Sequence, residues 1–177
     1  MVTSLPLEVL KTLAALWHVV AFAGGFAFVW QSYRALLGQI PHEPRWGKFI
    51  RKADIHLWLS GFVIIGLGIL SSGLLHYLSN PKLWTKSLLI LVWLIATQTM
   101  RRYAMPRFKA GIRTPMLLTA AISLGCWSYG AFLGVAKGLA YGALPFTVLV
   151  SGFLLTLSAS LVLTFLLDQQ RPTQARA

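Results

Sequence analysis

Residues 145–167 read PFTVLVSGFLLTLSASLVLTFLL, and this stretch contains no charged side chain. A helix of about 20 mainly apolar residues is long enough to cross the hydrocarbon core of a bilayer. Irregular backbone cannot face lipid, and the stretch lacks the alternation of a membrane β-strand. Pro145 stands where the helix would begin, a position at which its missing N–H costs nothing. The stretch therefore predicts a transmembrane helix.

Four further stretches are long and apolar enough to be interpreted in the same way. The five predicted spans are residues 7–33, 55–78, 83–100, 115–139 and 145–167. Of the 177 residues, 56% are hydrophobic and 11% are charged, whereas a soluble domain has about 25% charged residues. We therefore expect an all-α integral membrane bundle of five transmembrane helices, folded as a single domain over residues 1–177 with a short solvated tail at 168–177.

The positive charges of the chain gather on one side of this bundle. The net charge is +12, from 16 Lys and Arg against 4 Asp and Glu. Twelve of the basic residues fall in the loop after the first span, the loop after the third span and the tail. Cytoplasmic loops carry such an excess. We expect an extracytoplasmic N-terminus, a cytoplasmic C-terminus and a location in the bacterial inner membrane, with anionic lipid and no nucleic acid at the basic loops.

Ionisable residues inside the spans are the candidates for function, because their burial in a membrane is costly. His18 lies in the first span, and its helical neighbours Ala14 and Gly25 leave room for a flat macrocycle or for another helix. The ring could bond across the bundle, bind haem iron, bind copper or carry a proton, since neutral imidazole suits iron and copper equally. His76 ends the second span on the same outer side, about 10 Å from the level of His18 if both helices are upright.

Lys86 is the second unusual charge. Only 14 residues separate it from Arg101, which is about 21 Å of helix and less than the roughly 30 Å thickness of the hydrocarbon core. Lys86 therefore either extends to the interface beside Trp84 or faces the same cavity as His18.

The other polar residues supply no catalytic motif. Asp54, which follows Arg51, is predicted to cap the N-terminus of the second span. His56 begins the same span on the cytoplasmic side and is placed outside the candidate site. The chain has no paired buried carboxylates, no glycine-rich phosphate loop and no HExxH helix. Hydrolysis and nucleotide chemistry are therefore not expected.

Small residues at four-residue spacing mark two spans. They are Gly130, Gly134 and Gly138 in the fourth span and Gly152, Thr156 and Ser160 in the fifth. Such stripes let helix backbones approach closely. We expect them to pack helices within one chain or between two copies of a homo-oligomer.

Three stretches in this order resemble a known group of proteins. They are ALWHVVAFAGG at 15–25, FIRKADIHLWLSGFVIIGLGI at 49–69 and YLSNPKLWTKSLLILVWL at 77–94. The order resembles a family of small bacterial membrane proteins of unknown function, related to HemJ-type protoporphyrinogen oxidases and CopD-type copper-uptake proteins. The resemblance covers about residues 14–103, and its most specific piece is NPKLWTK. In the HemJ type the residues corresponding to His18 and Lys86 are associated with a b-type haem.

The resemblance implies a redox or metal-linked membrane protein, with haem b favoured over copper. The residues expected at the cofactor are His18, Lys86, His76 and Trp84, with Arg51 and Asp54 in supporting positions. The expected function is electron transfer with, or oxidation of, a membrane-soluble partner such as a quinone or a porphyrinogen. Whether the protein is an enzyme stays open. Copper handling by His18 and His76 is the alternative, and a non-catalytic assembly subunit is the third.

Overall fold

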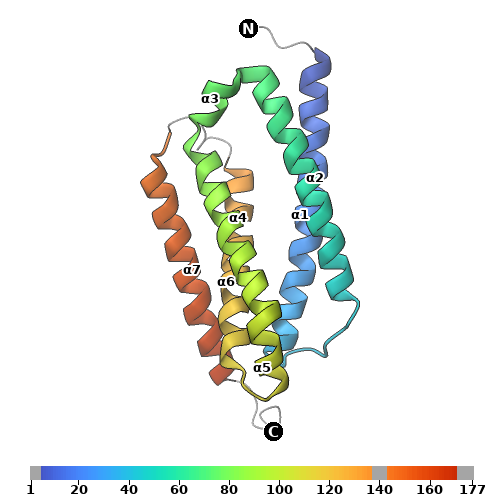
Figure 1. The fold of residues 1–177 in the computed structure, drawn as a ribbon, viewed down its shortest axis with the longest axis vertical. Coiled ribbons are helices and arrows are strands. Elements are labelled where there is room, and N and C mark those ends of the chain that lie inside the picture. Colours follow the sequence, from blue (N-terminus) through green and yellow to red (C-terminus); the bar gives the residue numbers. More distant parts are fainter. Residues whose placement is uncertain (1–4, 137–142, 171–177) are drawn as a thin grey trace. The chain divides into compact units, whose positions relative to one another are not determined.

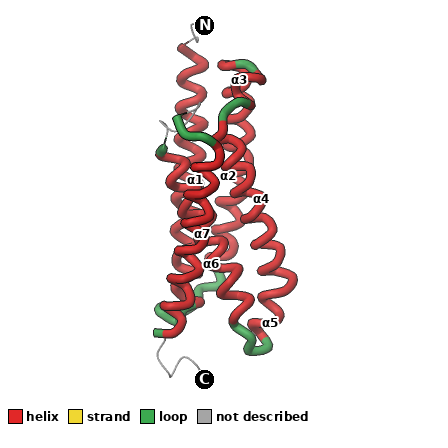
Figure 2. Tube along the Cα trace, turned by 90° about the vertical axis from the view of Figure 1, so that its left-hand side faces the viewer, coloured by secondary structure: helices red, strands yellow, loops and turns green. Residues whose placement is uncertain are grey.

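The computed structural model describes residues 5–136 and 143–170, and these parts of the chain contain helices and turns but no strand (Figures 1 and 2). Five helical stretches among them are long and apolar enough to cross a membrane, namely Leu5–Leu36, Trp46–Ser72, Pro81–Lys109, Thr114–Val135 and Phe146–Gln169. The predicted all-α architecture with five membrane-spanning helices is therefore confirmed.

The described parts of the chain form eight helical segments. They are α1 Leu5–Leu36, α2 Trp46–Ser72, α3 Leu74–Leu78, α4 Pro81–Thr99, η1 Met100–Ala104, α5 Met105–Lys109, α6 Thr114–Val135 and α7 Phe146–Gln169. The segment η1 is one turn of π-helix between α4 and α5. Pro106 stands in the first turn of α5 and has no N–H to donate to the carbonyl of Arg102, so the regular hydrogen-bond ladder is interrupted there.

The second span differs most from its prediction. The helix α2 begins at Trp46, nine residues before the predicted start at residue 55, and ends at Ser72. Gly73 follows with a φ of +81°, a backbone conformation that residues with a side chain rarely adopt. The helix therefore ends there, and the separate short helix α3 follows. Residue 78, the predicted end of the span, is therefore the end of a separate helix.

Charge explains why the start of α2 was predicted too late. Lys48, Arg51 and Lys52 lie in the first turns of the helix. Lysine and arginine are good helix formers, so their positions mark the edge of the apolar segment and not the beginning of the helix. Asp54 lies inside α2, and the residue at the N-terminal cap is Arg45. The prediction that Asp54 caps this helix is therefore wrong.

Two compact units make up the chain. Unit 1 is Met1–Gln31 with Glu43–Asn80, and unit 2 is Ser32–His42 with Pro81–Ala177. Unit 1 thus holds most of α1 together with α2 and α3. Unit 2 holds the last turn of α1 together with α4, η1, α5, α6 and α7. Residues 137–142 and 171–177, which include part of the predicted fourth span and most of the tail, lie outside the described residues.

The core of unit 2 lies where α6 packs against α7 and α4, which run side by side in Figure 1. Cys126, Tyr129 and Leu133 of α6 are buried together with Leu149 and Phe153 of α7. The hydroxyl of Tyr129 donates a hydrogen bond of 2.5 Å to the backbone carbonyl of Leu149. The polar end of this aromatic side chain is therefore satisfied inside an otherwise apolar core.

The close approach of α6 to α7 occurs at a different glycine from the predicted stripe. A Cβ added to Gly125 would lie 2.8 Å from a methyl carbon of Leu157, whereas a Cβ added to Gly134 would meet nothing within 4 Å. On α7, a Cβ added to Gly152 would lie 3.0 Å from the Tyr129 hydroxyl. The stripe on α7 therefore borders α6, whereas Gly134 of the α6 stripe faces open space. Pairing of two copies stays a prediction.

These two glycines of α6 form a matched pair for a stability test. Gly125→Ala should lower stability, because overpacking a tight interface costs about 1–3 kcal/mol. Gly134→Ala should be neutral or stabilising by up to about 1 kcal/mol, because alanine is the better helix former. Thermal unfolding of the detergent-purified proteins measures both. Equal melting temperatures would mean that Leu157 moves aside and that the close approach contributes nothing.

Candidate functional site

His18 is joined to α2 by two consecutive hydrogen bonds. Its Nδ1 lies 2.9 Å from Oγ of Ser60, and that hydroxyl donates to the backbone carbonyl of His56 over 2.6 Å. A hydroxyl carries one proton. Because the Ser60 proton is directed to the carbonyl, its oxygen accepts the bond from His18, and Nδ1 carries the hydrogen. When the ring is neutral, this tautomer has its lone pair on Nε2.

The surroundings of the His18 ring are small. Ser60 is fully buried, and Ala14, one turn before His18, is buried as well. Gly61 provides no side chain, and a Cβ placed there would lie 3.8 Å from Cε1 of His18. Serine in a helix commonly bonds back to the carbonyl four residues earlier, which is how Ser60 reaches His56. The ring therefore lies against small residues of α1 and α2, with its Nδ1 bonded to Ser60.

Aromatic contacts also join α1 and α2. Trp17 meets the ring of His56 edge-on, with the ring centres 6.1 Å apart. Nearer the loop, Phe28 stacks on Phe49 with centres 4.7 Å apart. The histidine of α2 beside Trp17 and His18 is therefore His56, which the sequence analysis placed at the start of the span and outside the site. The earlier start of α2 is the reason for this difference.

His76 lies on α3, where it is exposed. The ring of the next residue, Tyr77, lies against Gly68 of α2. Gly68 is eight residues beyond Ser60, which corresponds to about 12 Å of helix rise. His18 and α3 are thus at clearly different levels of α2, close to the separation expected from the sequence. A metal site shared by His18 and His76 would need α3 to move by about this distance.

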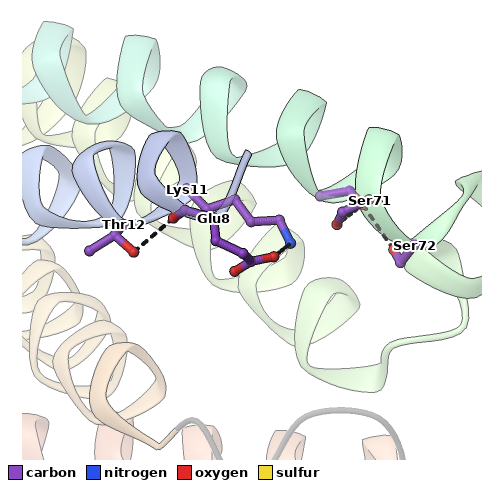
Figure 3. A network of polar contacts seen from close by, with 6 residues as sticks. Glu8, Lys11, Thr12, Ser71 and Ser72 are labelled. Carbon is purple, nitrogen blue, oxygen red and sulfur yellow. Dashed lines mark hydrogen bonds and ion pairs between the residues drawn. The ribbon is translucent and has the colours of Figure 1, made fainter. Parts of the chain in front are cut away.

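The end of unit 1 near α3 is also polar (Figure 3). On α1, Lys11 pairs with Glu8 at 2.9 Å, and Thr12 donates to the carbonyl of Glu8. On α2, the hydroxyls of Ser71 and Ser72 donate to a carbonyl of the preceding turn. Each of these contacts stays within one helix. They satisfy polar groups at the end of an apolar helix and bring no catalytic pair together.

The other supporting residues of unit 1 lie on the first turns of α2. Arg51 is exposed, and Asp54 is half-buried. Asp54 is six residues before Ser60, which is about 9 Å of helix rise. The bonds from His18 to Ser60 and from Ser60 to His56 involve neither of these side chains.

In unit 2, the NPKLWTK motif opens α4. Lys82 is buried, and its Nζ donates a hydrogen bond of 2.7 Å to the carbonyl of Ala136, just after the last residue of α6. A cation in that place complements the helix dipole and satisfies a terminal carbonyl. Lys86, one turn later, is half-buried, and Trp84 is exposed. The lysine of this motif with a hydrogen bond to another helix end is therefore Lys82, which the sequence analysis did not single out.

A second polar cluster ties the end of α1 to α7 within unit 2. Nη2 of Arg113 lies 3.0 Å from Oδ1 of Asp168 and donates over 2.8 Å to the carbonyl of Leu36. One turn away, the hydroxyls of Tyr33 and Thr164 are 2.9 Å apart and buried. These contacts join helix ends and are structural. The sequence feature that could have indicated this cluster is Asp168, a single acid at the end of an apolar helix.

Within residues 5–136 and 143–170 there is no group of three or more His, Cys, Asp or Glu side chains arranged to hold a metal ion. Haem needs fewer protein ligands than a bare metal ion, because a single histidine can be its proximal ligand. His18 fits that role chemically, since its Nδ1 is hydrogen-bonded to Ser60 and the neutral tautomer with its proton on Nδ1 has its lone pair on Nε2.

Comparisons of the chain with protein-family models, with curated proteins and with solved structures gave no match. The contacts of His18 therefore define the candidate site.

Proposed function

We propose that this chain is a membrane-embedded b-type haem protein that exchanges electrons with a partner dissolved in the bilayer, such as a quinone or a porphyrinogen. The observation that supports the proposal is the hydrogen-bond chain from His18 through Ser60 to the carbonyl of His56. Metal-ligating histidines usually donate their other ring N–H to a protein oxygen, which sets the tautomer and raises the basicity of the ligand. Haem would supply one-electron chemistry.

The residues around His18 have separate roles in this proposal. Ser60 orients the imidazole and keeps the proton on Nδ1, so that Nε2 can bind iron. Many large apolar side chains of α1 and α2, including Val19 and Phe62, are exposed, as lipid contact requires. A partner soluble in lipid would reach the site through this apolar surface. The resemblance adds Lys86 and Trp84 as further cofactor contacts.

We also propose that the chain is a bacterial inner-membrane protein with its N-terminus outside and its C-terminus in the cytoplasm. The support is the excess of Lys and Arg in the loops after the first and third spans. A reporter enzyme fused after residue 177 should be active only in the cytoplasm. Activity on the outside would contradict this topology.

An absorbance spectrum of the detergent-purified protein tests the haem proposal. We expect a Soret band that shifts on reduction with dithionite, and a haem-to-protein ratio near one. Bound copper without a Soret band would replace the proposal by copper handling. A protein with neither cofactor would be better explained as an assembly subunit.

Lys86→Arg tests the second cofactor contact. Arginine is bulkier and always protonated, so it could neither ligate iron nor release a proton. Loss of a supporting group at a metal site commonly costs about 10–100-fold in affinity or activity, so we expect a lower haem-to-protein ratio or a shifted spectrum. The matched control is Lys11→Arg, because Lys11 is also half-buried but pairs with Glu8 of its own helix. Wild-type haem content in Lys86→Arg would mean that Lys86 extends to the membrane interface instead.

A further inference from the structure

The segment that joins α4 to α6 carries a basic surface that the haem proposal does not use. Residues 100–113 contain no acid and five basic residues, Arg101, Arg102, Arg107, Lys109 and Arg113. Ala104 is fully buried and Phe108 half-buried, and these two side chains hold η1 and α5 against the rest of unit 2. Arg101, Arg102, Arg107 and Lys109 are exposed.

These basic side chains differ in the partners that they contact. Arg113 is paired with Asp168. Arg107 lies over the ring of Tyr103, with its guanidinium carbon 3.7 Å from the ring centre, and donates to the hydroxyl of the same tyrosine. Arg101, Arg102 and Lys109 have no acidic partner within the described parts of the chain. The surface therefore keeps most of its positive charge, and one of its guanidinium groups is held in place by an aromatic ring.

The chemistry of this surface fits a phosphate group. Guanidinium groups bind phosphate through paired hydrogen bonds, which gives both geometry and charge complementarity. The two adjacent arginines of η1 follow the apolar helix α4 without a break, within one candidate span that runs from Pro81 to Lys109. Cations at the end of an apolar helix lie at the depth of the lipid headgroups when that helix crosses a bilayer.

Apolar neighbours favour a lipid over a soluble polyanion. Tyr103, Met105 and Ile112 are exposed between the basic residues. A nucleic acid or an acidic protein segment bound to the cations would leave these side chains in water. A phospholipid would place its phosphate on the cations and its glycerol and acyl groups against them.

We propose that η1 and α5 bind the headgroup of an anionic phospholipid, with Arg101 and Arg102 as the main phosphate contacts. The bound lipid fixes the end of α4 in the headgroup layer. It contributes to how the helix is held in the membrane, independently of any cofactor at His18.

Native mass spectrometry of the full-length protein in detergent tests this site. The protein is titrated with phosphatidylglycerol and, separately, with phosphatidylcholine of the same acyl chains. Arg101→Gln/Arg102→Gln should bind phosphatidylglycerol about 30-fold more weakly, since each cation near an anionic surface contributes about fivefold. The matched control is Arg45→Gln/Lys48→Gln, which removes the same charge from exposed positions of unit 1. The control should lose clearly less affinity for phosphatidylglycerol than Arg101→Gln/Arg102→Gln.

Several outcomes would overturn the site. Equal binding of the two lipids would exclude headgroup recognition, and equal loss in both double variants would reduce it to net charge. Displacement of the lipid by millimolar inorganic phosphate would indicate a site for the free anion, and displacement by a short RNA would indicate a nucleic-acid surface. Because all four substituted residues are exposed, unchanged melting temperatures should confirm that the variants are folded.

Discussion

Purified His18→Ala protein should contain no haem, whereas Ser60→Ala should retain a fraction with a shifted Soret band. The first change removes the proposed iron ligand. The second leaves the ligand in place but removes the oxygen, 2.9 Å away, that accepts its Nδ1 hydrogen. Losing such a supporting bond commonly lowers metal affinity by about 10–100-fold. The two variants should therefore differ in degree, and the measurement is the haem-to-protein ratio in matched membrane preparations.

Ser71→Ala is the control for Ser60→Ala. Both serines lie on α2 and bond back to a carbonyl of their own helix, but only Ser60 also bonds to His18. A general effect of losing a serine from α2 would appear in both variants. We expect Ser71→Ala to keep the wild-type haem content.

His56→Ala distinguishes the two histidines on this level of the α1 and α2 pair. The side chain of His56 contacts Trp17, and its part in the hydrogen-bond chain of His18 is played by its backbone carbonyl. Alanine keeps that carbonyl, so haem should be retained. A wild-type Soret band in His18→Ala combined with its loss in His56→Ala would make His56 the ligand and overturn the assignment.

The five spans could be predicted from the sequence because burial in lipid requires long apolar runs, and such runs are visible in one dimension. The bounds of α2 could not be predicted in this way. Its first residues are charged and face water, where helix formation depends on propensity and not on apolarity. The end of α2 depends on Gly73, whose φ of +81° is a property of the folded backbone. The sequence does contain one sign of this break, because Gly73 follows Ser71 and Ser72 and a Ser-Gly pair commonly marks a turn.

Only one of the two residues that define the candidate site could be predicted from the sequence. His18 stands out because an ionisable group within an apolar run is unusual. Ser60 does not stand out, since serine is tolerated in membrane helices by bonding to its own backbone. Their meeting depends on the register of two antiparallel helices joined by a loop, and periodicity within either helix does not specify that register. For the same reason His56 was passed over while His76 was singled out.

The largest loss of stability is expected from Arg113→Ala, at about 1.5–3 kcal/mol, which is typical of hydrogen bonds to charged groups. Nη2 of Arg113 bonds both Asp168 and the carbonyl of Leu36. Asp168 lies in the last turn of α7, where a negative charge is opposed by the helix dipole, and the guanidinium compensates for it. Without Arg113, the carboxylate of Asp168 lies at the negative end of the α7 dipole without its compensating cation. The carbonyl of Leu36, at the end of α1, also loses a hydrogen-bond donor.

Asp168→Ala should cost less, under about 1 kcal/mol, because both members of the pair are about one quarter exposed and the unfavourable charge leaves with the acid. Arg113 then still bonds to Leu36. The double variant should therefore be no less stable than Arg113→Ala alone, since removing the acid relieves the charge that the first change left unpaired. Unfolding in mixed micelles, followed by tryptophan fluorescence, measures all three free energies. Strictly additive losses would show that Arg113 and Asp168 act independently and that the ion pair does not join the ends of α1 and α7.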